Sequence, residues 1–193
     1  MSPRKSDATR RRLLDAATAD FAAHGIAGAR VDRIAAAAGI NKAQLYAYFG
    51  DKLGLFGAVF RLHADVVVDS VPFTADDLPQ YAVRLYDTAM ERPELIRLAT
   101  WARLEGVATN NLVTESSATV ATKLQAIADA QRDGRITDSM DPQDVLALLI
   151  AMALTWSASG LSATAAPDDP PAAHDRRKQA LSRAVSGAFG ARG

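Results

Sequence analysis

One run of residues near the N-terminus constrains the fold of this chain more than any other feature. Residues 32–40, Asp-Arg-Ile-Ala-Ala-Ala-Ala-Gly-Ile, are typical of a short helix that a glycine stops. Asn41 then stands where a helix N-cap belongs, and Gln44 follows three residues later, where the partner in a capping box belongs. The run therefore predicts two short helices joined by a tight turn at Gly39.

The remainder of the chain also predicts helices. Ala and Leu dominate, whereas Val, Ile and Thr do not alternate in strand-like patterns. Caps and breakers predict an all-α fold of about nine helices, over residues 7–24, 31–38, 41–48, 51–70, 76–92, 93–106, 116–133, 141–160 and 174–189. We expect a polar loop over 109–115 and a linker over 164–171. The expected domains are a helix-turn-helix domain, 1–50, and a larger helical domain, 51–193.

Charge is unevenly distributed between these two parts. Residues 1–52 hold nine Lys and Arg against five Asp, a net charge of +4, and the remainder holds 13 against 17 acidic residues, a net charge of −4. A basic N-terminal part favours contact with phosphates. The most apolar stretch, 145–156, is shorter than the roughly 20 residues that a membrane-spanning helix needs. We expect a cytoplasmic protein that does not enter a membrane. The chain has no cysteine, which excludes disulfides and thiolate metal sites.

The second helix of the run has the chemistry to read double-stranded DNA. Lys42 and Gln44 lie near its N-terminus, where recognition helices meet base edges in the major groove. Tyr46 and Tyr48 carry hydroxyls that can bond phosphate oxygens, and the small Ala43 permits a close approach to the groove. Leu45 and Phe49, four residues apart, are expected to face inward and anchor this helix.

With these residues in place, residues 9 to about 60 resemble the N-terminal domain of TetR-family transcriptional regulators. The matching pieces are Thr9-Arg10, Leu13-Leu14-Asp15-Ala16-Ala17, Phe21, Gly25, Val31, Ile34-Ala35, Ala38-Gly39-Ile40, Leu45-Tyr46, Tyr48-Phe49 and Lys52. The helical remainder is similar to the family's ligand-binding and dimerisation domain in architecture only. The resemblance implies a homodimer on a near-palindromic operator, released when a small molecule changes the spacing of its two DNA-binding domains. Half-sites would lie roughly 34–36 Å apart.

The resemblance also assigns roles within the motif. Asn41, Tyr46 and Lys52 stand where the family places phosphate contacts, and Lys42 and Gln44 where it places base contacts. The residues expected at the DNA are Arg30, Asn41, Lys42, Ala43, Gln44, Tyr46, Tyr48 and Lys52.

Two departures from the family's pattern stand on either side of the motif. Ala29 and Arg30 replace the usual Thr or Ser before Val31, so the hydroxyl cap of the helix over 31–38 is missing and Arg30 is a candidate phosphate contact. Gly54 and Gly57 lie inside the helix over 51–70, where each costs about 1 kcal/mol relative to Ala. They either loosen this helix as a hinge or allow close packing against the first helix.

Aromatic residues and methionines of the larger domain are candidates for an effector pocket, with plain core as the alternative. They are Tyr81, Tyr86, Met90, Trp101, Met152 and Trp156. Arg97, Arg103 and Glu105 flank Trp101 and could orient a polar effector or face solvent. The last two helices have apolar residues on more than one face, which is typical of a dimeric four-helix bundle or of burial within one protomer. Their candidate interface residues are Leu148, Met152, Leu181, Val185 and Phe189.

The motif predicts a sequence-specific DNA-binding regulator, and the resemblance implies that it responds to a ligand and acts as a repressor. Its expected partners are double-stranded DNA, a small-molecule effector of unknown identity and a second copy of the chain. We find no metal-ligand spacing, phosphate-binding glycine loop or catalytic constellation, so we expect no enzyme, metal or cofactor. The alternative is a small-molecule or partner-binding protein of the same fold without specific operator binding.

Overall fold

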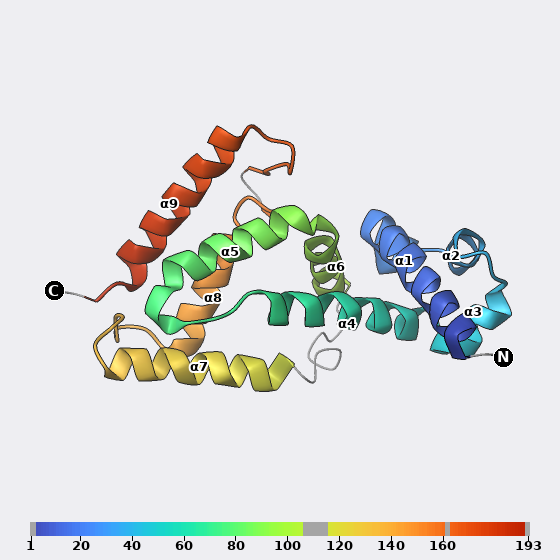
Figure 1. The fold of residues 1–193 in the computed structure, drawn as a ribbon, viewed down its shortest axis with the longest axis horizontal. Coiled ribbons are helices and arrows are strands. Elements are labelled where there is room, and N and C mark those ends of the chain that lie inside the picture. The colour runs from blue at the N-terminus through green and yellow to red at the C-terminus, as the bar shows by residue number, and fades with distance from the viewer. Residues whose placement is uncertain (1–2, 106–115, 161–162, 192–193) are drawn as a thin grey trace. The chain divides into compact units, whose positions relative to one another are not determined.

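A computed structural model of the chain describes residues 3–105, 116–160 and 163–191, and these residues confirm the predicted all-α fold (Figure 1). The helices are α1 Pro3–Gly28, α2 Val31–Ala37, α3 Lys42–Phe49, α4 Lys52–Ser70, α5 Leu78–Glu91, α6 Pro93–Leu104, α7 Ser116–Arg132, α8 Pro142–Ala153 and α9 Pro171–Phe189, with a short 3-10 helix, η1, over Ala75–Asp77. The loop expected over 109–115 lies outside the described residues. Within the described ranges, none of the helices has the length and hydropathy to cross a membrane.

The chain forms two compact units. The first comprises Met1–Val66 and Glu94–Val113, and the second comprises Val67–Pro93 and Thr114–Gly193. The first unit therefore extends beyond residue 50, because the N-terminal part of α4 and all but the first residue of α6 pack with α1–α3. The functional division at residue 50 stays a prediction.

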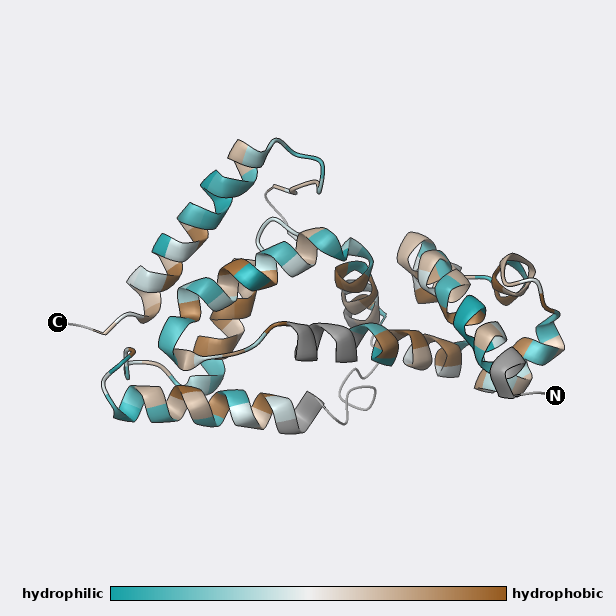
Figure 2. Cartoon of the chain, in the orientation of Figure 1, coloured by the Kyte–Doolittle hydropathy of each residue, from teal (hydrophilic) through white to brown (hydrophobic). Residues whose placement is uncertain are grey.

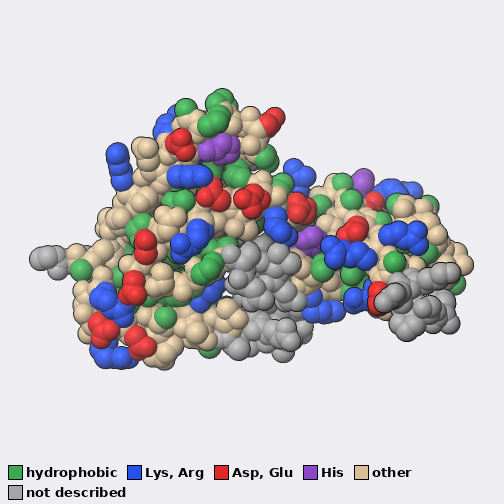
Figure 3. Space-filling view, viewed as in Figure 1, with side chains coloured by type: hydrophobic (Ala, Val, Ile, Leu, Met, Phe, Trp, Pro, Cys, Tyr) green, Lys and Arg blue, Asp and Glu red, His purple; other side chains and the backbone are tan. Residues whose placement is uncertain are grey.

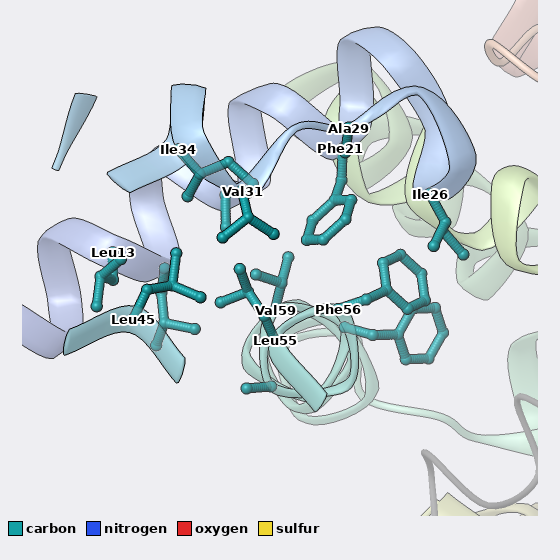
Figure 4. Packing of buried hydrophobic residues seen from close by; sticks show 14 of the residues in the cluster. Leu13, Phe21, Ile26, Ala29, Val31, Ile34, Leu45, Leu55, Phe56 and Val59 are labelled. Carbon is teal, nitrogen blue, oxygen red and sulfur yellow. The ribbon is translucent and has the colours of Figure 1, made fainter. Parts of the chain in front are cut away.

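Apolar side chains from five helices form the core of the first unit (Figure 4). Phe21 of α1 and Phe56 of α4 meet edge to face, with ring centroids 5.2 Å apart. Leu45, from α3, and Leu98, from α6, are both fully buried in the same cluster. Full burial of a leucine side chain contributes about 1.5–3 kcal/mol, so Leu45 fixes α3 to the rest of the unit.

In the second unit, α5 packs against both α8 and α9 (Figure 1). Figure 2 shows α8 as mostly hydrophobic and α9 as mostly hydrophilic. The apolar residues of α9 recur at four-residue spacing and are all buried; they are Leu181, Val185 and Phe189. A single apolar stripe of this kind is enough to hold an otherwise polar helix on its neighbour.

Two helix boundaries in the second unit differ from the predicted ones by three residues or more. The helix predicted over 141–160 ends at Ala153, because hydroxyl groups compete for its backbone carbonyls. Thr155 Oγ1 donates to the Ala151 carbonyl at 3.1 Å, and Ser157 Oγ donates to the Leu154 carbonyl at 2.7 Å. The last helix begins at Pro171 rather than at residue 174, because proline suits the first position of a helix.

Helix α1 also starts earlier than predicted, at Pro3 instead of residue 7. Its predicted end at Gly25 is confirmed by the backbone, since Gly25 has φ 72° and ψ 179°. One further turn follows and reaches Gly28. We call residues 25–30, which lead from this interruption into α2, the α1–α2 corner.

Candidate nucleic-acid interface

The capping box predicted at the start of α3 is present. Asn41 is extended, with φ −91° and ψ 161°, and its Oδ1 accepts a hydrogen bond from the Gln44 backbone N–H at 2.8 Å. Gln44 Oε1 accepts in return from the Asn41 backbone N–H at 3.2 Å. A cap of this kind stabilises a helix by about 1 kcal/mol. The start of α3 is therefore held in place by its own side chains.

Side chains of α3 divide between the core and the surface. Leu45 is fully buried, whereas Lys42, Ala43 and Gln44 are exposed. Tyr46 is 39% exposed. The structure thus presents the N-terminal residues expected at base edges on one open surface.

Two other predicted residues of α3 are less open. Tyr48 and Phe49 are half-buried, with ring centroids 6.1 Å apart. Phe49 packs against the core of the unit as expected, and the Arg10 guanidinium lies 5.8 Å from its ring centroid. Tyr48 packs against the same core, so less of it is accessible to a phosphate than of Tyr46.

Lys42 is held by an acidic residue of α2. Its Nζ lies 3.1 Å from both carboxylate oxygens of Asp32. Both side chains are open to solvent, at 48% exposed for Lys42 and 74% for Asp32. The hydrogen bond from Lys42 to Asp32 raises the pKa of the Lys42 ammonium, so it stays charged.

A buried carboxylate, Asp20, organises the α1–α2 corner. Asp20 is 7% exposed and accepts hydrogen bonds from the Arg30 backbone N–H at 3.0 Å and from Arg33 Nη2 at 3.0 Å. Arg33 Nε donates to its second oxygen, Oδ1. Burial alone would raise the pKa of Asp20, but these hydrogen bonds outweigh it and the pKa lies below its usual value. The sequence does indicate that Asp20 is buried, because it shares one helical face with the apolar residues Leu13 and Ala17.

Arg30 is exposed and occupies the N-cap position of α2. No side chain caps that helix, consistent with the missing hydroxyl. The Arg30 backbone N–H is bound to Asp20, which positions the residue while leaving its guanidinium open to solvent. Arg30 thus stays a candidate for phosphate contact.

Lys52 is turned toward the protein. Its Nζ donates to the Ala27 carbonyl at 3.1 Å and lies 3.4 Å from the Ala29 carbonyl. The residue was expected to hold a phosphate, and in the structure its ammonium holds the α1–α2 corner. Both roles are compatible, because a lysine ammonium has three donors.

The C-terminal part of α6 and the residue after it also contact the α1–α2 corner. Glu105, which follows α6, accepts hydrogen bonds from the backbone N–H groups of Ile26 at 2.8 Å and Ala27 at 3.1 Å. The Trp101 ring covers Gly25 so closely that a Cβ there would lie 2.8 Å from the ring. Glu105 was considered for effector binding, and its observed partners are backbone groups of α1. Nothing in the local sequence near Glu105 indicates partners 78 and 79 residues away.

Gly54 lies close to the backbone at the end of α3, and the choice between a hinge and packing of α4 against α1 stays open. A Cβ on Gly54 would lie 2.2 Å from the Phe49 carbonyl oxygen, which no side chain can tolerate without a backbone shift. Its N–H donates to Asp51 Oδ1 at 2.7 Å, which confirms Asp51 as the cap of α4. Gly54 itself is exposed, whereas Gly57 is buried. Replacing Gly54 by Ala would therefore strain the unit whether or not α4 bends.

The candidate effector residues are separated between the two units. Trp101 belongs to the first, whereas the other five belong to the second. Tyr86 is 1% exposed, its hydroxyl lies 2.7 Å from His174 Nδ1, and its ring meets Trp156 edge to face. Tyr81 is 2% exposed and accepts a hydrogen bond from Lys123 Nζ at 2.9 Å.

A small open cavity of about 140 Å³ lies elsewhere in the second unit, between η1 and the C-terminal end of α9. Its lining includes Leu78, Ile136 and Phe189 and none of the candidate effector residues. Ligand pockets usually measure about 300–1,000 Å³, so this cavity is too small for such a role.

The candidate interface residues also fall into two groups. Leu181, Val185 and Phe189 are at most 2% exposed and pack inside the protomer, so they are not available to a partner in this arrangement. Helix α9 packs against α5 within the protomer, as in the alternative that the sequence left open, and the interface role of these residues stays a prediction. On α8, Leu148 is 44% exposed and Met152 is half-buried. Ile150 is also exposed, at 38%.

Figure 3 shows Lys and Arg side chains spread over the N-terminal unit, at the right of the view, with acidic side chains between them. Helix α3 is capped and exposed, it carries Lys42, and Arg10 lies over the ring of its Phe49. This combination is typical of DNA-reading helices.

Comparisons with known proteins agree with this geometry. The model of the TetR-family bacterial regulatory proteins matches residues 13–59, and the tetracyclin repressor-like C-terminal domain matches residues 77–186. The HTH-type transcriptional repressor SCO4008 of Streptomyces coelicolor is 44% identical over 158 residues, 81% of this chain and 82% of its own length. The regulator RutR of Escherichia coli is 28% identical, over 77% of this chain and 73% of its own length.

Solved structures show the same fold. The candidate transcriptional regulator SCO4942 of Streptomyces coelicolor superposes with a TM-score of 0.77 at 38% identity, covering 95% of this chain and 99% of its own. A TetR-family regulator from Marinobacter aquaeolei gives 0.72 at 21% identity, covering 99% and 100%, which shows the fold alone. The two matching domains together span most of the chain, which therefore belongs to the TetR family of DNA-binding transcriptional regulators.

Proposed function

We propose that this regulator is a homodimeric repressor in which α3 of each protomer enters the major groove of a near-palindromic operator. The observation that carries the proposal is the presentation of α3. A capping box fixes its first turn, Leu45 anchors its inner side, and the polar residues Lys42 and Gln44 stand open on its outer side. Repression is supported by the 44% identical repressor SCO4008.

Gln44 is the residue we assign to base recognition. Its Oε1 already accepts the Asn41 N–H, so its amide NH₂ is the group left to donate. Acceptors in the major groove that suit this donor are guanine O6 and N7, adenine N7 and thymine O4. Lys42, two residues before Gln44 on the same exposed surface, is the second base contact. Tyr46 and Arg30 bind phosphates.

Release of the operator by a small molecule is the regulatory part of the proposal. The buried aromatic side chains of the second unit, Tyr81, Tyr86 and Trp156, are the candidate effector contacts. On α8, the exposed Leu148 and the half-buried Met152, which lies four residues later on the same face, are the candidate contacts to the second protomer. Because this function requires access to chromosomal DNA, we place the protein in the cytoplasm.

Replacing Gln44 by Glu tests the assignment of base recognition. Glutamate keeps an acceptor for the Asn41 N–H, and so the capping box, but loses both donors. We expect an unchanged melting temperature and an altered base preference at one position in each half-site, with a loss of about 1–3 kcal/mol on the original operator. Selection of bound sequences from a random duplex library measures this preference. An identical selected motif for both chains would refute the assignment.

A second substitution, Tyr46→Phe, provides a matched control. It removes one hydroxyl from α3, so binding to every sequence should weaken alike while the selected motif stays the same. A protein that binds a random duplex as well as its own promoter would instead favour the alternative, a binding protein without a specific operator.

A further inference from the structure

The contact between Lys42 and Asp32 joins the reading helix α3 to α2 across the surface that we assign to DNA. The ammonium lies at 3.1 Å from each carboxylate oxygen, so both oxygens share the charge. In the structure the Lys42 side chain therefore reaches from α3 toward α2.

An exposed ion pair of this kind adds little to stability. Pairs between solvent-exposed side chains contribute about 0–1 kcal/mol, because water and salt screen them and because ordering long side chains has an entropic cost. With 48% and 74% of the two side chains exposed, stability gives no sufficient reason for an acidic group on a surface that meets phosphates.

The pair has a clearer consequence for how Lys42 meets DNA. An unpaired lysine on a flexible four-carbon stem binds the nearest phosphate of any sequence as a point charge. Such contacts raise affinity for all DNA equally and carry no sequence information. A carboxylate that pairs with the ammonium weakens this gain on random DNA. On the operator, a guanine that offers two acceptors replaces Asp32 as the partner of the ammonium.

We infer that Asp32 is a specificity-determining residue, which suppresses non-specific phosphate binding by Lys42 and so raises the ratio of operator affinity to random-DNA affinity. This inference rests on the proposed function, because it requires that α3 reads a specific sequence. Asp32 itself touches no base in this scheme and acts through Lys42.

Asp32→Asn in the full-length chain tests the inference. Binding is measured on a duplex from the chain's own promoter region and on a random duplex of equal length, between about 0.05 and 0.3 M salt, a roughly sixfold range of ionic strength. We expect affinity for random DNA to rise about five- to tenfold per DNA-binding domain near 0.1 M salt, with a salt slope steeper by about 0.9. The promoter duplex should gain less, so the ratio falls. Both duplexes are titrated with the same protein preparation. A change in the folded fraction therefore cancels in the ratio of promoter affinity to random-DNA affinity.

A double-mutant cycle with Lys42→Gln separates two causes of the gain. If Asp32 acts through Lys42, Asp32→Asn leaves the ratio unchanged in the Lys42→Gln background. A gain of equal size in that background would mean that Asp32 repels phosphates directly, and would overturn the inference. An unchanged ratio in the single variant overturns it as well, while the preference of the wild-type chain for its promoter leaves the proposed function standing. A wild-type chain without that preference overturns both.

Discussion

The Glu105 carboxylate accepts a hydrogen bond from the Ile26 backbone N–H at 2.8 Å, which ties the end of α6 to the α1–α2 corner of the DNA-binding unit. The corner is also held by Asp20 and Lys52, so charged groups from three helical segments meet its backbone. This corner leads directly into α2, which packs against α3. Its geometry therefore sets the geometry of the reading helix.

Glu105→Ala should loosen this corner. The substitution removes the acceptor of two backbone N–H groups, a loss of about 1–3 kcal/mol. We expect faster hydrogen exchange at the amides of Ile26 and Ala27 and weaker binding to the promoter duplex. Glu105→Gln keeps an acceptor oxygen and should retain protection at both amides. Equal exchange in wild type and Glu105→Ala would show that Glu105 does not hold the corner in solution.

Asp20 predicts a stability that depends on pH. Its folded pKa lies below the unfolded value of about 3.9, so its contribution is present above that pH and is lost as pH falls through the folded pKa. We expect Asp20→Asn to lower the free energy of unfolding at pH 7 by about 3 kcal/mol and to reduce the further loss between pH 5 and acid. Urea titrations from pH 7 down to pH 3 measure both chains. Parallel pH curves would contradict this role.

Lys52→Met should affect both folding and DNA binding, whereas Tyr46→Phe should affect DNA binding alone. The Lys52 ammonium holds the Ala27 carbonyl, and removal of that hydrogen bond costs about 1–2 kcal/mol. Thermal melting and binding to a random duplex, measured on the same preparations, separate the two effects. A melting temperature that Lys52→Met leaves unchanged would count against the observed contact.

Substitutions on α8 and α9 should separate the proposed interface from the protomer core. Leu148 is 44% exposed, so Leu148→Arg should leave the fold intact and convert a dimer to a monomer in sedimentation equilibrium. Phe189 is 1% exposed, and Phe189→Ala should cost about 3–5 kcal/mol of stability. A Leu148→Arg variant that remains fully dimeric would exclude this part of α8 from the interface.

Local features of the fold could be predicted from the sequence because a few neighbouring residues decide them. The Asn41–Gln44 box and the Asp51 cap each involve partners three residues apart. The predicted end of α8 was wrong. The apolar pattern continues to Trp156, but the hydroxyls of Thr155 and Ser157 bond backbone carbonyls there. Such competition depends on side-chain geometry that a hydrophobic pattern does not contain.

Contacts between distant segments could not be predicted in the same way. Glu105 and Ile26 lie 79 residues apart, and neither has a neighbour that indicates the other. The stripe on α9 shows a similar limit, since a periodic row of apolar residues requires a partner surface but does not say whether α5 or a second protomer supplies it. Only the packing of the second unit assigns Phe189 to the protomer core.

The measurement that tests this account most directly compares binding of the wild-type chain to its own promoter region and to random duplex DNA across a salt series. The account predicts an affinity at least about 10³-fold higher for the promoter, and a steep fall of both affinities with salt as phosphate contacts are lost. Equal affinities for the two duplexes would contradict it.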